Sequence, residues 1–216
     1  MMRYERKFIV EENFKNRISH FLFENKFMRE YPTRNINSIY YDSIDFYRFL
    51  ESEEGFSDRS KLRLRFYDDP NNLHLEQKFK NSEIGLKEIA SFKIFNEKSL
   101  IKIKVKDCDN KVINIKIPQK IESEIPSLFV SYKRDYFNNR EEKIRITIDY
   151  KLRFGKIRNG SYVIKSPQNI SSDFAVLEAK YDSSIETLST LENISNNYFL
   201  TLSRCSKYCY GINACY

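Results

Sequence analysis

The chain has 216 residues, enough for one domain with a substantial hydrophobic core, and a formal net charge of +7 that favours anionic partners. No apolar run approaches the roughly 20 residues of a membrane-spanning helix, and the charged N-terminal stretch is unlike a secretory signal peptide. We therefore expect a single domain over residues 1–216, located in the cytoplasm, with no transmembrane segment and with any membrane tether supplied by a partner.

The cysteines and histidines argue against two common kinds of site. Cys108, Cys205, Cys209 and Cys215 form no CxxC pair and have no histidine near them in the sequence. Zinc sites need closely spaced thiolate and imidazole ligands, so this spacing is poor for zinc. With only two histidines in the chain, catalysis by a nucleophile–histidine pair also has little support. We expect free thiols.

Hydrophobic periodicity predicts a fold made mostly of strands. In chain order, we predict a strand at 3–10, a helix at 11–27, a strand at 37–41, a helix at 44–53 capped by Asp42 or Ser43, strands at 60–67, 72–80 and 84–95, a helical or irregular excursion at 96–127, strands at 128–138, 143–154, 161–165 and 174–181, a helix at 183–198 and a short final helix at 202–212. Such a pattern predicts an α+β fold, namely a closed antiparallel eight-stranded β-barrel, or a strongly curved sheet, with flanking helices.

The most informative stretch is Lys61–Phe66, in which cations and apolar residues alternate strictly. Period-two alternation puts Lys61, Arg63 and Arg65 on one face of a strand. The same parity on other predicted strands carries His74, Glu76, Lys78, Lys87, Tyr132, Arg134, Arg145, Thr147, Asp149, Glu178 and Lys180, and the opposite parity is largely apolar. A half-buried sheet with its polar face in water would show similar alternation. However, most charged residues on this face are Arg or Lys, and predicted amphipathic helices could cover the apolar face, so we expect an enclosed cationic surface for a phosphate-rich ligand.

Carboxylates are interleaved with these cations. Glu5, Glu76, Asp149 and Glu178 lie on the same strands as the lysines and arginines. Mg²⁺ and Mn²⁺ are commonly held by one or two carboxylates together with substrate phosphate. A salt bridge to a neighbouring cation is the alternative for each of these carboxylates.

Ordered motifs over nearly the whole chain carry a family resemblance. They are Tyr4-Glu5-Arg6-Lys7-Phe8, Ile39-Tyr40-Tyr41-Asp42, Leu62-Arg63-Leu64-Arg65-Phe66-Tyr67, Leu75-Glu76-Gln77-Lys78, Gly85-Leu86-Lys87, Tyr132-Lys133-Arg134, Ile144-Arg145-Ile146-Thr147-Ile148-Asp149, Val176-Leu177-Glu178-Ala179-Lys180 and Ser206-Lys207-Tyr208. Each motif is weak alone, but their order and spacing resemble the polyphosphate polymerase (VTC-type) domain of the triphosphate tunnel metalloenzyme superfamily.

The resemblance implies an eight-stranded tunnel that binds nucleoside triphosphate and a divalent metal, Mn²⁺ or Mg²⁺, and transfers the terminal phosphate of ATP onto inorganic polyphosphate. By motif, phosphates would be held by Lys7, Arg63, Arg65, Lys78, Arg134, Arg145 and Lys207, with Lys87, Tyr132 and Lys180 as further substrate-binding residues. Glu178 would bind the metal, and Glu5 and Glu76 are further candidates.

Two other functions stay open at this point. One is a tunnel-type triphosphatase that uses water as the acceptor, although Arg3 stands where the wider superfamily often has a first glutamate before Glu5 and Lys7, which agrees better with the polymerase branch. The other is a non-enzymatic polyanion-binding module that stacks nucleic-acid bases on its aromatic residues. Many aromatic residues fall on the apolar parity, where core packing is their expected role, so no nucleic-acid partner is expected.

Overall fold

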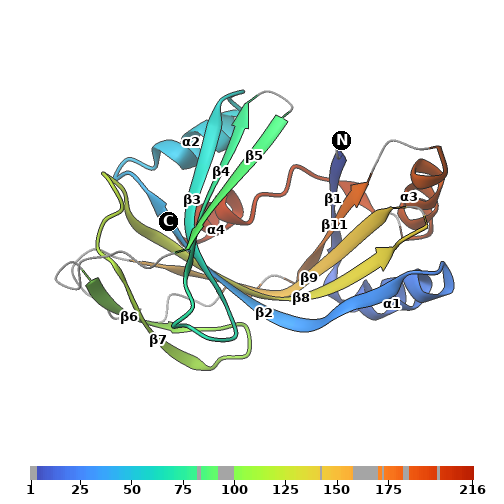
Figure 1. Ribbon diagram of the computed structural model, residues 1–216, viewed down its shortest axis with the longest axis horizontal. Helices are drawn as coiled ribbons and strands as arrows, with labels where there is room; N and C mark the ends of the chain where they lie inside the picture. The colour runs from blue at the N-terminus through green and yellow to red at the C-terminus, as the bar shows by residue number, and fades with distance from the viewer. Residues whose placement is uncertain are drawn as a thin grey trace. The chain divides into compact units, whose positions relative to one another are not determined.

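The computed structural model describes residues 4–81, 84–91, 100–141, 143–157, 170–171, 173–181, 185–198 and 200–216 (Figure 1). The elements are β1 (Tyr4–Glu11), a short 3-10 helix η1 (Glu12–Phe14), α1 (Lys15–Glu24), β2 (Met28–Asp42), α2 (Tyr47–Glu54), β3 (Arg59–Tyr67), β4 (His74–Asn81), β5 (Ile84–Ser91), β6 (Leu100–Lys106), β7 (Val112–Pro118), β8 (Ile125–Asn139), β9 (Ile144–Lys156), β10 (Ile170–Ser171), β11 (Phe174–Tyr181), α3 (Ile185–Tyr198), β12 (Thr201–Leu202) and α4 (Lys207–Cys215). Within these residues, no helix has the length and apolar character needed to cross a membrane.

Most strands belong to one ten-stranded sheet in the order β12-β1-β11-β9-β8-β2-β3-β4-β5, with β10 paired to β9. Pairing is antiparallel between β1 and β11, β11 and β9, β2 and β3, β3 and β4, and β4 and β5. The α+β prediction is therefore confirmed. The order ends at β12 and β5, and in the described part of the chain these two strands do not pair with each other, so the sheet is an open path there.

The chain divides into two compact units, each built from discontinuous stretches. Unit 1 comprises Met1–Arg34, Tyr132–Leu152 and Ser172–Cys205, and unit 2 comprises Asn35–Ser131, Arg153–Ser171 and Ser206–Tyr216. The long strands β2, β8 and β9 supply residues to both units.

In unit 1, two helices cover the apolar face of the sheet. Ile18 and Leu22 stand four residues apart on α1 and are fully buried, and α3 contributes Leu191 and Ile194. They pack in one cluster with alternate residues of the strands, namely Phe8, Val10, Phe137, Ile144, Ile146, Ile148, Ala175, Leu177, Ala179 and Tyr181. The prediction that amphipathic helices cover the apolar parity is confirmed here.

In unit 2, a β-hairpin takes that covering role. Strands β6 and β7 pair in antiparallel register and form a separate two-stranded sheet, seen in green in Figure 1. Their buried residues Ile103, Val105, Ile115 and Ile117 pack with Ile39, Tyr41, Leu62, Leu64, Phe66 and Phe129. The prediction of a helical or irregular excursion at 96–127 is wrong for this hairpin. Alternation of lysine or asparagine with isoleucine and valine is a strand pattern, and here it buries one face against β2 and β3.

Other boundaries also differ from the predictions. Strand β2 starts at Met28 rather than at residue 37, and its first residues, Met28–Thr33, are exposed, so hydrophobic alternation gave no signal there. Pro126 lies at the start of β8, where its missing N–H is tolerated, instead of breaking a pattern. The predicted strand at 161–165 falls outside the described residues. The N-cap position of α2 is held by Phe46 and not, as predicted, by Asp42 or Ser43. The side chains of those two residues still accept hydrogen bonds from the first backbone N–H groups of the helix, Ser43 from Tyr47 and Asp42 from Arg48 and Phe49. All four cysteines are free, as expected.

Tyr41 ties the hairpin of unit 2 to β2 and makes stability depend on pH. Its ring is 1% exposed and its hydroxyl donates to the carbonyl oxygen of Pro118 at 2.8 Å. Burial raises the pKa of Tyr41 above its ordinary value of 10.0. The unfolded chain therefore loses this proton first as the pH rises, so the stabilisation is complete below about pH 10 and is lost above it.

We expect Tyr41→Phe to lower the free energy of unfolding at pH 8 by about 1 kcal/mol, because one buried hydrogen bond is lost. Above pH 10 the variant should lose stability less steeply than the wild type, by up to about 1.4 kcal/mol per pH unit for one proton. Urea denaturation between pH 8 and 11 measures both effects. Tyr47→Phe is the control, because its ring is 63% exposed. Equal slopes for Tyr41→Phe and the wild type would contradict this account.

Candidate functional site

Charged side chains gather on the polar face of the sheet in each unit. We call Ser38, Tyr40, Lys61, Arg63, Arg65, Glu76 and Lys78 the unit 2 cluster, and Glu5, Lys7, Glu30, Tyr132, Arg134, Tyr136, Arg145, Asp149, Glu178 and Lys180 the unit 1 cluster. The predicted alternation is therefore confirmed in both units.

In the unit 2 cluster, two arginines share one carboxylate. Arg63 donates from Nε and Nη2 to Glu76 Oε2 at 2.8 and 2.6 Å, and Arg65 Nη1 lies 3.6 Å from the same oxygen. The strand register makes these contacts, because Arg63 lies opposite Glu76 on β4. The side chains of Glu76 and Arg65 are only 5% and 8% exposed. This polar face is thus not an ordinary solvated face, since its central charges are removed from water.

The positive charges of this cluster act on the hydroxyl of Tyr40. Its hydroxyl accepts a hydrogen bond from Arg63 Nη1 at 3.0 Å, and its ring stacks on Tyr208 with centroids 4.8 Å apart. Burial raises the pKa of Tyr40, but the positive charges of Arg63, Arg65 and Lys61 more than offset that effect, so its pKa is lowered overall. A local field that favours a phenolate also favours other anions, such as phosphate oxygens.

The C-terminal helix α4 is anchored to the same cluster. Lys61 Nζ donates to Ser206 Oγ at 2.7 Å, and Ser206 caps α4 by accepting from the backbone N–H of Cys209. Tyr208, in the first turn of α4, donates its hydroxyl to the fully buried Asp42. Lys207 is the first residue of this helix, so the predicted Ser206-Lys207-Tyr208 motif is brought to the strand that carries Arg63.

Lysines of three neighbouring strands stand at one register in unit 2. Lys61 on β3 lies opposite Lys78 on β4, and Lys78 lies opposite Lys87 on β5. The side chain of Lys87 is outside the described part of the structure, so only its backbone position is known. Like charges directly opposite one another across strands are destabilising. The row is therefore an arrangement that an anionic ligand would relieve.

In the unit 1 cluster, Arg134 and Asp149 form a two-pronged ion pair. Arg134 donates from Nε to Asp149 Oδ1 at 2.5 Å and from Nη2 to Oδ2 at 2.7 Å. The Asp149 side chain is 0% exposed and that of Arg134 16% exposed. Burial alone would lower the pKa of Arg134, but the negative charge of Asp149 raises it well above its usual range. The guanidinium also lies 5.5 Å from the ring centroid of Tyr132, so the pair and the tyrosine fix its position.

Arg145 lies near the N-terminal part of β2, which the sequence patterns did not identify as a strand. Its guanidinium lies 5.8 Å from the ring centroid of Tyr136 and its Nε lies 3.9 Å from Glu30 Oε2. The Arg145 side chain is 48% exposed, so this ion pair is loose and solvated. Glu30 was missed because its part of β2 shows no hydrophobic alternation.

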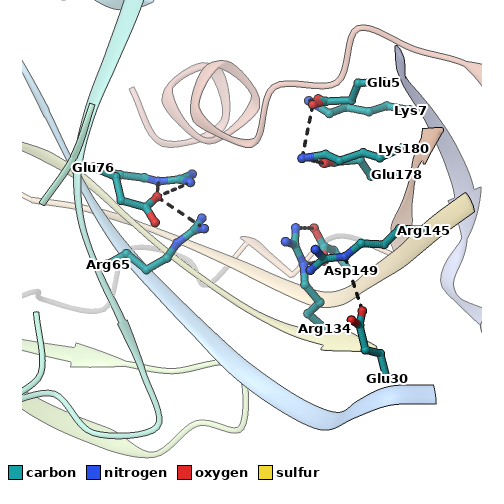
Figure 2. Close-up of polar contacts among 11 residues, drawn as sticks. Glu5, Lys7, Glu30, Arg65, Glu76, Arg134, Arg145, Asp149, Glu178 and Lys180 are labelled. Carbon is teal, nitrogen blue, oxygen red and sulfur yellow. Dashed lines mark hydrogen bonds and ion pairs between the residues drawn. The ribbon is translucent and has the colours of Figure 1, made fainter. Parts of the chain in front are cut away.

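Two glutamates and two lysines form an alternating group on β1 and β11 (Figure 2). Lys180 Nζ lies 3.1 Å from Glu178 Oε1 and 3.6 Å from Glu5 Oε2, and Lys7 Nζ lies 2.9 Å from Glu5 Oε1. One ammonium therefore lies close to both carboxylates. In the described part of the chain, no three acidic, histidine or cysteine side chains form a metal-binding group. A carboxylate pair already placed around a cation fits Mg²⁺ or Mn²⁺, which take one or two protein carboxylates plus substrate oxygens.

The structure thus separates the predicted site residues into two groups. Lys7, Tyr132, Arg134, Arg145, Lys180, Glu5 and Glu178 lie in unit 1, and Arg63, Arg65, Lys78, Lys87, Lys207 and Glu76 lie in unit 2. Sequence reasoning missed the functional candidates Tyr40 and Ser38, which bind the two arginines of β3. The sequence signal that could have identified them is their alternation with the apolar residues Ile39 and Tyr41, which puts them on the polar face of β2 opposite Arg65 and Arg63.

Comparisons with known proteins agree with this arrangement. A family model described as the VTC domain matches residues 2–216. No curated protein is significantly similar to the chain. A solved candidate adenylate cyclase from Vibrio parahaemolyticus has 12% identity and a TM-score of 0.51, with 95% of each chain covered.

Two further solved structures are similar over nearly their whole length. A candidate adenylyl cyclase from Hippeastrum, described as having a dominant triphosphatase activity, has 12% identity and a TM-score of 0.48, with 99% of this chain and 96% of that chain covered. A candidate adenylate cyclase from Bacillus halodurans has 12% identity and a TM-score of 0.49, with 95% and 96% covered. At such identities the Vibrio structure shows a shared fold, and the activities are those proteins' own.

Proposed function

Because the chain belongs to the VTC domain family, in the triphosphate tunnel superfamily, we propose that it is a polyphosphate polymerase that transfers the terminal phosphate of ATP onto a growing inorganic polyphosphate chain. The observation that carries the proposal is the polar face of the sheet in each unit, which carries lysines and arginines around a buried ion pair. Such a surface suits a ligand that carries many negative charges along its length.

Each cluster contributes phosphate-binding groups in this proposal. In unit 2, Arg63, Arg65, Lys78, Lys87 and Lys207 hold phosphate oxygens, and in unit 1, Lys7, Arg134, Arg145 and Lys180 do so, assisted by Tyr132. Guanidinium groups fixed by a carboxylate or an aromatic ring are already oriented before the ligand arrives, which reduces the entropy lost on binding. The contacts of Arg63 with Glu76 and of Arg134 with Asp149 serve this purpose.

Glu178 and Glu5 are the proposed holders of a divalent cation. Their carboxylates lie around the Lys180 ammonium, and the Glu178 side chain is 13% exposed. A Mn²⁺ or Mg²⁺ ion there would neutralise negative charge on the phosphates. The carboxylate of Glu76 is engaged by two arginines, so orienting these arginines is its first role, and metal binding by Glu76 stays a weaker part of the proposal.

The chemistry requires positioning more than proton transfer. Phosphoryl transfer proceeds with little covalent help from the protein, and most of the catalysis is alignment and charge stabilisation. The attacking group is a terminal phosphate oxygen of the growing chain, which is already ionised and needs no general base. The bond between the β-phosphate bridging oxygen and the γ-phosphorus of ATP breaks, the acceptor oxygen bonds to that phosphorus, and ADP leaves. Lysines and arginines around the phosphates stabilise the charge that moves to the leaving group.

Several finer points belong to the same proposal. A closed eight-stranded tunnel and a single VTC-type domain over residues 1–216 are expected from the resemblance, and a cytoplasmic location is expected from the sequence. A closed tunnel would keep water away from the transferred phosphate and so favour polymer growth over hydrolysis.

Incubating the purified protein with ATP and Mn²⁺ and separating the products on a polyphosphate gel tests the proposal. We expect chains that lengthen with time, and about hundredfold slower growth with Arg63→Ala, because one preoriented guanidinium is lost. Lys104→Ala removes an exposed cation from β6 and is the matched control. A thermal melt checks folding, and Arg63→Gln, which keeps a hydrogen-bond donor for Glu76, replaces Arg63→Ala if that variant is unfolded.

Two outcomes would contradict the polymerase, and a third would contradict only the role of the unit 2 cluster. Release of orthophosphate without polymer would show a triphosphatase. Salt-sensitive RNA binding without nucleotide turnover would show a polyanion-binding module. Chain growth that is unchanged in both Arg63 variants would remove the proposed role of the unit 2 cluster.

A further inference from the structure

Thr147 is a buried polar residue that none of the contacts above uses. It lies on β9 between Arg145 and Asp149, and alternation puts these three side chains on the same, polar face of the strand. Its Cα lies opposite that of Glu178 on β11. The residue is 6% exposed, and its Oγ1 has no hydrogen-bond partner in the described part of the chain.

An unpaired buried hydroxyl is unusual. Burying a hydroxyl without a hydrogen-bond partner costs free energy, because its bonds to water are lost and not replaced. Buried polar atoms in folded proteins are paired in the large majority of cases. Valine has nearly the same shape and would fill this position without that cost. A retained hydroxyl at such a place therefore calls for a partner that binds to the protein.

The neighbours of Thr147 are occupied with one another. The Asp149 carboxylate takes two hydrogen bonds from Arg134, and the Glu178 carboxylate pairs with Lys180. Thr147 and Arg145 lie on β9, which stands between β8 with Arg134 and β11 with Lys180. An anion held by these three cations would therefore come within reach of the Thr147 hydroxyl. A hydroxyl is both donor and acceptor, and against a phosphate oxygen it donates.

We infer that the Thr147 hydroxyl donates a hydrogen bond to a phosphate oxygen of the bound polyphosphate or triphosphate, making Thr147 a further substrate-binding residue. The inference rests on the proposed function, because it takes the phosphate chain as the ligand of the unit 1 cluster. It adds a neutral, short and rigid donor to a set of long charged side chains. Such a donor fixes the position of one phosphate more sharply than a lysine does.

Calorimetric titration with inorganic triphosphate in the presence of Mn²⁺ tests the inference without requiring turnover. We expect Thr147→Val to raise the dissociation constant about tenfold or more, as for a lost hydrogen bond to a charged group. Thr147→Ser keeps the hydroxyl and should bind within about threefold of the wild type. The free energy of unfolding of Thr147→Val should be equal to or higher than that of the wild type, because a hydroxyl without a protein partner is removed.

The outcomes separate this inference from the proposed function. If wild type binds triphosphate but makes no polymer, the polymerase proposal fails, and weaker binding by Thr147→Val still supports the inference. If Thr147→Val binds as tightly as the wild type, or Thr147→Ser binds as weakly as Thr147→Val, the hydroxyl has no ligand role. If wild type does not bind triphosphate, both proposals are overturned.

Discussion

Asp149→Ala is expected to destabilise the protein by about 3 to 5 kcal/mol, the largest loss of stability that we predict for a single substitution. The Asp149 carboxylate is fully buried and receives both hydrogen bonds of the Arg134 fork. Its removal leaves a guanidinium that is 16% exposed without its counter-charge. Because a guanidinium cannot give up its proton, the charge stays and its desolvation is no longer offset. Chemical denaturation at neutral pH measures the loss.

The matched variant removes both charges together. Replacing Arg134 by Met and Asp149 by Val leaves no unpaired charge, so the double variant should be more stable than Asp149→Ala and close to the wild type. It should nevertheless be a poor polymerase, because the proposed phosphate ligand Arg134 is gone. If the free energy of unfolding of Asp149→Ala is within about 1 kcal/mol of the wild-type value, the ion pair is better solvated than its burial indicates.

The strand pattern of the sequence predicted much of the fold because the sheet has two chemically different faces. Alternation at Lys61–Phe66 corresponds to β3, whose apolar residues are buried while Arg63 contacts Glu76. The strand at 174–181 agrees with β11 at both ends, and apolar and charged residues alternate in its second half, Leu177–Tyr181. Where both faces of a strand are exposed, as in the first part of β2, the pattern vanishes and the strand was missed.

The candidate site was predictable as a list of residue types but not as a set of contacts. Parity put Glu76, Arg63 and Arg65 on one face, and only the register of β3 against β4 determines that both arginines reach the same oxygen. The role of α4 was also hidden, because the contact of Lys61 with Ser206 joins residues 145 positions apart. Long-range pairing of this kind depends on how elements pack, which local periodicity does not encode.

The hairpin of β6 and β7 was not predicted, although its sequence carries a strand pattern. Polar and apolar residues alternate in this hairpin as regularly as in β3, but Pro118 and Pro126 nearby favour irregular chain in a prediction from sequence. Pro118 is the last residue of β7, and its carbonyl accepts the hydrogen bond from Tyr41, so it ends a strand rather than prevents one. A proline at a strand end costs no ladder hydrogen bond.

The largest loss of activity is expected for Glu178→Gln, about 10²–10³-fold in the rate of ATP turnover with Mn²⁺. Glutamine preserves the size of the side chain and can still accept a hydrogen bond from Lys180, which lies 3.1 Å from Glu178 Oε1. It lacks the negative charge that a divalent cation requires. The variant should therefore fold normally, and its apparent affinity for Mn²⁺, measured by calorimetry in the presence of triphosphate, should fall with the rate.

Glu5→Gln is the matched control on the neighbouring strand. Glu5 is more exposed, at 30%, and contacts both Lys7 and Lys180, so its charge is shared and better solvated. We expect a smaller loss of about tenfold, because a carboxylate that is better solvated contributes less to holding the cation. If Glu178→Gln binds Mn²⁺ as well as the wild type but still loses activity, the charge of Glu178 acts on Lys180 and not on a metal, and metal binding must be assigned to other residues. Equal losses in the two variants would instead mean that both carboxylates hold the cation to the same degree.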